Sequence, residues 1–167
     1  MAIGFRFFAV LSTLALLPAT TAMAADAITV NSARVVVDAV ELAMKRNSPQ
    51  EIAGNLSADC IIKVTGPMPD GSRRVHQVTR QQFVDAAEED AKHDTDYHYE
   101  STVQKVSIAN GNAVAQVQST TSYTDNGKNI REVENAVETL ELRRGRVFVT
   151  AVDAQEVGLT VDGKRLF

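Results

Sequence analysis

The sequence predicts an α+β domain in which a curved, largely antiparallel sheet wraps around helices from the first part of the chain. Three observations predict this class. Residues 33–44 carry apolar side chains at helical spacing, whereas the second half of the chain alternates apolar and polar residues. Asn-Gly pairs at 110–111 and 126–127 separate the alternating segments and favour tight hairpins. The four resulting strands, each of about a dozen residues, exceed the usual five or six and must twist, so we expect the helices to fill the curve.

The chain begins with the features of a secretory signal peptide. Arg6 is the only charged residue before Asp26, residues 7–17 form an apolar run, and residues 22–24 (Ala-Met-Ala) match a cleavage pattern. An apolar core of ~11 residues is too short to cross a bilayer as a helix. We therefore expect residues 1–24 to be removed and residues 25–167 to form a single domain, periplasmic or secreted, with no membrane insertion after cleavage. An uncleaved membrane anchor is the alternative.

The composition limits the partners and the chemistry. With 17 basic and 21 acidic residues and a net charge of −4, the chain lacks the basic surface that nucleic-acid binding needs. Cys60 is the only cysteine, so no internal disulfide can form, and the apolar residues after it favour a buried thiol over a nucleophile. We expect no cofactor.

Three helices are expected in the first part of the chain. The stripe over residues 33–44 predicts the first, capped by Asn31 or Ser32. Ser48 and Pro49 predict the start of a short second helix, with Glu51 closing a capping box. Thr79 and the glutamine three residues later form another capping box before a third helix over about residues 80–92. Two strands, residues 60–64 and 74–78, with a turn at residues 70–71, lie between the second and third helices.

Period-two alternation then predicts four strands, over residues 97–109, 113–124, 130–143 and 146–157. The tail, residues 158–167, shows no clear pattern. On the second of these strands the odd positions are the more apolar, so we expect that face to lie against the core.

This order of elements resembles the NTF2-like superfamily, a cone-shaped, cystatin-like α+β fold with SnoaL-like and ketosteroid-isomerase-like members. The segments that carry the resemblance are residues 56–62, residues 78–83 and the closing hairpin, residues 139–149, in which Val147 stands where the family commonly has Trp. The resemblance implies a cavity at the open end of the cone. It implies no single activity, because the superfamily contains isomerases, dehydratases, cyclases and epoxide hydrolases as well as non-catalytic domains.

Glu138 is the first candidate for a site residue. Leu140 and Leu142 must be buried, and Glu138 shares their face of the strand unless a bulge intervenes. A carboxyl group in an apolar cavity has a raised pKa, as a general acid or base needs. The alternatives are a bulge that resets the register, a dimer interface, or solvent. We expect Glu132 and Glu134, nearer the turn, to be solvated.

Tyr123 and His76 are candidate partners of Glu138. Tyr123 lies on the core-facing side of its strand, and a titratable histidine in the hairpin could lie at the cavity mouth, although a half-exposed strand position is the simpler interpretation of His76. The tyrosine that ketosteroid-isomerase relatives place on the first helix is missing. Residues 93–98 (His-Asp-Thr-Asp-Tyr-His) contain metal-binding side chain types, but we expect a solvated linker and no metal site.

Three functional hypotheses follow. The first is a domain that binds a small apolar or amphipathic molecule in its cone. The second is an isomerase, dehydratase or hydrolase that uses Glu138 with Tyr123 or His76. The third is an interaction module of the cell envelope, which pairs with itself as a homodimer or with an envelope protein through the polar outer face of the sheet that carries Gln116, Gln118 and Thr120.

Overall fold

The helices and strands follow one another in the predicted order. The computed structural model describes residues 27–68 and 72–167, so the predicted signal peptide and the turn at residues 70–71 lie outside the described residues. The described elements are α1 (Val30–Lys45), α2 (Pro49–Asn55), β1 (Leu56–Pro67), β2 (Arg73–Thr79), α3 (Arg80–His93), β3 (Thr95–Ala109), β4 (Asn112–Asp125), β5 (Lys128–Arg143), β6 (Arg146–Val161) and β7 (Lys164–Arg165). Among these helices, none combines the length and apolar character needed to cross a membrane.

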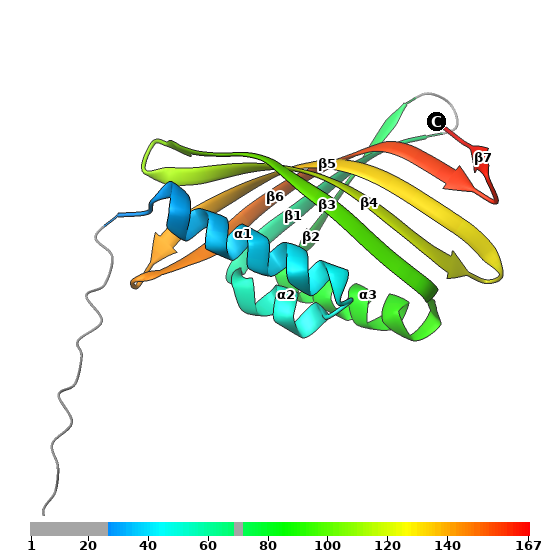
Figure 1. Cartoon of the computed structure of the whole chain (residues 1–167), viewed down its shortest axis with the longest axis horizontal. Coiled ribbons are helices and arrows are strands. Elements are labelled where there is room, and N and C mark those ends of the chain that lie inside the picture. Colours follow the sequence, from blue (N-terminus) through cyan, green and yellow to red (C-terminus); the bar gives the residue numbers. More distant parts are fainter. Residues whose placement is uncertain (1–26, 69–71) are drawn as a thin grey trace, which may run out of the picture.

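The strands form one curved, mixed sheet in the order β2-β1-β6-β5-β4-β3, with β7 attached to β6. All neighbours are antiparallel except β1 and β6, which run parallel. The helices lie together on one side of the arching strands (Figure 1). This arrangement confirms the predicted α+β class with a curved sheet around the first helices.

Tight turns set the hairpins of the long strands. Asn110 and Gly111 have φ values of 51° and 80°, and Asn126 and Gly127 have 48° and 76°, the left-handed pairs of a type I′ turn. Both predicted Asn-Gly hairpins are therefore confirmed. The tail differs from expectation, because β6 continues to Val161 and a further turn with positive φ leads into β7.

The helix starts agree in part with prediction. Thr29, one residue before the start of α1, is its N-cap and forms a capping box with Ser32, so the predicted cap at Asn31 or Ser32 was wrong by a few residues. Ser48 is the N-cap residue of α2, but its side chain makes no capping hydrogen bond. The box before α3 is confirmed: the Thr79 side chain accepts from the backbone N–H of Gln82, whose Oε1 accepts from the Thr79 N–H at 2.9 Å.

Replacing Thr79 with Ala is expected to lower the free energy of unfolding by about 1 kcal/mol, because α3 loses the acceptor for an N-terminal N–H. Urea unfolding measures the loss. The variant Gln82→Ala removes the other half of the box, and the double variant should lose less than the sum of the two single variants. Strict additivity would show that the two side chains do not act together.

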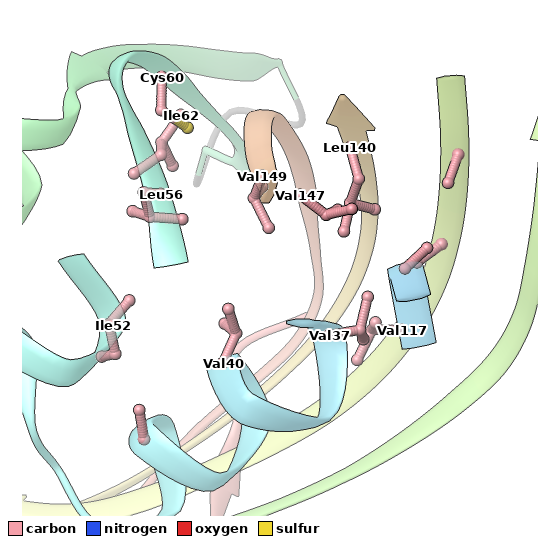
Figure 2. Close-up of a cluster of buried hydrophobic side chains, with 14 of the residues drawn as sticks. Val37, Val40, Ile52, Leu56, Cys60, Ile62, Val117, Leu140, Val147 and Val149 are labelled. Atoms are coloured by element: carbon pink, nitrogen blue, oxygen red, sulfur yellow. The ribbon is translucent and has the colours of Figure 1, made fainter. Parts of the chain in front are cut away.

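The apolar core lies between α1 and the strands β1, β4, β5 and β6. Val37 and Val40 of α1 point toward Leu140 and Val149 on the sheet (Figure 2). Cys60 is fully buried in the same cluster, as predicted, and burial raises the pKa of its thiol to about 11. The thiol is therefore suited to packing and not to nucleophilic attack.

The register of β5 determines which way its glutamates point. The β4–β5 ladder runs without a shift from the Asp125–Lys128 pair to the Ala113–Leu140 pair. The two irregularities of the β5–β6 ladder leave the extra residue on β6, at Val157 and Thr150. No bulge interrupts β5, so Glu138 and Leu140 face the same side.

Candidate functional site

The concave side of the sheet and the helices enclose an inner cavity of about 190 Å³. Its walls are mainly apolar and include Val40, Met44, Ile52, Ile62, Phe83 and Val152. Its charged side chains are Glu41 from α1 and Glu134 and Glu138 from β5. No lysine, arginine or histidine is found among the described residues that line it. The cavity is therefore both apolar and acidic.

A wider outer cavity of about 770 Å³ adjoins the inner one, since Met44, Ile52, Phe83 and Glu134 line both. It lies between the helices and the ends of β4 and β5. Its wall carries five acidic residues and one histidine, which are Asp90, His93, Asp94, Asp125, Glu132 and Glu134. The two cavities together form a passage whose outer part is polar and whose inner part is apolar.

Glu138 lies in the inner part of this passage. Its side chain is about 5% exposed, and its Oε2 atom has no hydrogen-bond partner within the described part of the chain. Burial, with a further contribution from the charge of Glu41, raises the pKa of Glu138 to about 8. Buried polar atoms without a protein partner are uncommon, and such an atom is available to hydrogen-bond a water molecule or a ligand.

Glu134 and Glu132 continue the row of carboxyl groups outward along β5. The prediction that they are solvated was wrong, because both are partly buried and line the cavities. Burial, and then the charges of Glu132 and Glu156, raises the pKa of Glu134 to about 7. The sequence signal was present: even positions from Glu132 to Leu142 share one face, and with no bulge all of them turn inward.

Neither Glu41 nor Tyr99 was among the predicted acid–base residues. The hydroxyl of Tyr99 on β3 donates to Oε2 of Glu41 at 2.8 Å. Both residues, with Ser119, also line a groove of about 570 Å³ between α1 and the β3–β4 hairpin. The Tyr99–Glu41 pair thus forms the wall between groove and inner cavity. Glu41 lies four residues after Val37 of the apolar stripe, and residues at that spacing share a helix face, which is the signal that could have placed Glu41 at the cavity edge.

Tyr123 lies in the outer cavity and not beside Glu138. Its hydroxyl donates to Oε1 of Glu132 at 3.0 Å. The β4 residue opposite Glu138 is Ala115, eight positions before Tyr123, a separation of about 27 Å along the strand. The structure therefore brings Tyr123 together with Glu132.

His76 lies on β2 opposite Val64, and its side chain is exposed. It lines neither the inner nor the outer cavity. In the 93–98 segment, His93 Nε2 lies 3.0 Å from Glu89 and His98 Nε2 lies 3.2 Å from Glu100. Within residues 27–68 and 72–167, no group of three His, Cys, Asp or Glu side chains could hold a metal ion.

Solved structures share this architecture. A ketosteroid isomerase-like protein from Erwinia carotovora atroseptica has a TM-score of 0.60 and 10% identity, over 77% of this chain and 95% of that one. An NTF2-like protein from Cytophaga hutchinsonii has a TM-score of 0.59 and 12% identity, over 76% of this chain and 97% of its own. The chain has the NTF2-like fold.

A protein with a cystatin-like fold from Caulobacter vibrioides is also similar to this chain, with a TM-score of 0.56 and 20% identity, over 76% of this chain and 88% of that one. No protein-family model and no curated protein sequence matches this chain. At identities of 10–20% the similarity concerns the NTF2-like fold and not an activity.

Proposed function

We propose that this NTF2-like domain binds a small amphipathic molecule in its inner cavity, with the apolar part against Val40, Phe83 and Val152 and the polar part at Glu138. The observation that carries this proposal is the Oε2 atom of Glu138, which is buried and has no partner among the described residues. A ligand with one polar group would satisfy that atom and fill the apolar space around it.

The size of the cavity suggests the size of the ligand. An apolar cavity of about 150 Å³ in another protein binds benzene. The inner cavity here measures about 190 Å³, which suits a benzene ring with one short polar substituent. The polar outer cavity, which shares Glu134 with it, offers the route of entry.

Benzyl alcohol is therefore a suitable first probe, with binding measured by ¹H–¹⁵N NMR titration. The variant Ala136→Leu places a larger side chain in the inner cavity and is expected to weaken binding by about tenfold or more. Val137→Leu is the matched control, because Val137 is the next residue on the same strand but is 42% exposed. Equal binding by the two variants would contradict the proposal, as would a failure of the unaltered protein to bind either benzyl alcohol or a charged probe with the same apolar body.

The second candidate function is acid–base catalysis in the same cavity, which is favoured by the pKa of Glu138, about 8, near physiological pH. A carboxylate so placed could remove a proton from the carbon next to a ketone and return it. Deuterium exchange of 2-indanone in D₂O, followed by NMR, tests this reaction. Exchange should accelerate up to about pH 8 and be lost in Glu138→Gln. Exchange that is unchanged in that variant would remove Glu138 from the reaction.

A further inference from the structure

We propose that the ligand of the inner cavity is a small organic cation, an ammonium group on an apolar body, whose charged group binds Glu138. This inference rests on the proposed function and names its ligand class. It depends on three observations: the signs of the charges around the cavity, the unpartnered atom of Glu138, and the composition of the passage that leads to it.

The inner cavity contains acceptor groups that suit a donor. Glu41, Glu134 and Glu138 are its acidic groups, and no basic residue among the described lining residues accompanies them. An ammonium group has only N–H donors, whereas an ionised carboxyl group only accepts, so the two are complementary. An anionic ligand would meet three carboxyl groups and no counter-charge, and this cavity disfavours it.

The outer cavity favours the same class of ligand. Asp90, Asp94, Asp125 and Glu132 line it, and His93 is its one basic side chain among the described lining residues. His93 contacts Glu89, and both side chains are largely exposed. A concave surface with one sign of charge concentrates the oppositely charged solute, so cations are enriched at the entrance.

The titratable groups around Glu138 come from α1, β1, β3 and β5. Glu41 of α1 and Glu134 of β5 are the acidic groups, Tyr99 of β3 and Cys60 of β1 the other titratable ones. β4 and β6 present Ser119, Val152 and Ala154 to the cavity, and α2 and α3 present Ile52 and Phe83. Lys45 of α1 lines the groove beyond the Tyr99–Glu41 pair and does not line the inner cavity.

Because of these groups, the affinity for an organic cation should depend on pH. Without ligand, the raised pKa of Glu138, about 8, keeps this group largely protonated at pH 7. A bound ammonium group favours the ionised carboxylate, so binding at pH 7 should release close to one proton. Affinity should therefore rise between pH 6 and pH 8 and level off above it. A neutral ligand that accepts a hydrogen bond from protonated Glu138 would show the opposite trend.

Three probes with the same apolar body test the ligand class: benzylamine, benzyl alcohol and benzoate. Binding to the full chain is measured by isothermal titration calorimetry at pH 6, 7 and 8.5, in two buffers that differ in ionisation enthalpy. We expect benzylamine to bind about tenfold or more tightly than benzyl alcohol at pH 8.5 and to release protons at pH 7. We expect no binding of benzoate.

Two variants assign the effect to Glu138. Glu138→Gln should reduce the affinity for benzylamine to that for benzyl alcohol and abolish the proton release, while benzyl alcohol still binds. Asp153→Asn is the matched control, because it removes one negative charge from the exposed side of β6 and should leave the preference unchanged. Glu134→Gln tests the second carboxyl group and should weaken benzylamine binding less than Glu138→Gln.

The outcomes separate the two proposals. If benzyl alcohol or benzoate binds as tightly as benzylamine, the cation inference is overturned while binding in the cavity stands. If a preference for benzylamine survives in Glu138→Gln, the assignment to Glu138 is overturned. If none of the three probes binds, the proposed function fails together with the inference.

Discussion

Raising the pH from 5 to 8.5 is expected to lower the free energy of unfolding by roughly 3–5 kcal/mol through Glu138 alone. In the unfolded chain this carboxyl group titrates near its ordinary pKa of 4.5, whereas burial raises its pKa to about 8 in the folded protein. Between these values the folded state binds more protons than the unfolded state. Stability is therefore highest below the lower value, falls as the pH rises between them, and is constant above pH 8 with respect to this group.

The variant Glu138→Gln tests this expectation by urea unfolding at pH 5, 6, 7 and 8.5. It removes the titrating group but keeps the shape of the side chain, so the loss of stability over this range should shrink by several kcal/mol. A smaller slope should remain, because the pKa of Glu134 is also raised, to about 7. Glu132→Gln is the comparison variant for the same pH series, because the Glu132 carboxyl group accepts a hydrogen bond from the Tyr123 hydroxyl, whereas Oε2 of Glu138 has no partner among the described residues. A pH profile identical to that of the unaltered protein would show that folding does not raise the pKa of Glu138.

Replacing Leu140 with Ala is expected to destabilise the protein by about 3–5 kcal/mol. Leu140 is fully buried and lies opposite Ala113, which is too small to fill the space that the substitution would leave. The loss in stability therefore has two parts: the favourable burial of the methyl groups that the substitution removes, and the cost of the cavity that remains. Urea unfolding at pH 6 measures it.

Val137→Ala provides the control for this substitution, because Val137 lies on the same strand but is 42% exposed on the opposite face. We expect this variant to change the free energy of unfolding by less than about 1 kcal/mol. If Leu140→Ala were as mild as the control, the end of the sheet near Leu140 would be less tightly packed than the structure indicates.

Local sequence signals predicted most of the elements. Alternation and two Asn-Gly turns identified β3, β4 and β5, and the odd positions of β4 do face the core, where Ala113, Ala115 and Val117 are buried. The sequence analysis did not predict the parallel pairing of β1 with β6. These strands are far apart in the chain, and no local sequence pattern encodes their contact. The continuation of the tail into β7 was missed for a related reason: a two-residue strand is too short to show a period.

The candidate site was predicted less completely than the fold. Glu138 was identified from its position beside Leu140, and the structure places it in the cavity. The burial of Glu132 and Glu134 was missed because proximity to a turn suggested solvent, whereas α3 and the end of α1 help to cover that part of the sheet. The contact between Tyr99 and Glu41 joins residues 58 positions apart, so it depends on tertiary packing that the sequence does not display.

The two irregularities of the β5–β6 ladder both lie on β6, and this placement limits how β5 can change. Since β5 itself runs without interruption, substitutions at positions 132, 134, 136 and 138 would alter the lining of the passage and leave the strand ladder intact. A single deletion upstream of Leu140 on β5 would instead rotate those side chains toward the outside. If the proposed function holds, point mutations along this strand would change which ligand the cavity accepts, whereas a change in its length would turn the cavity lining away from the ligand.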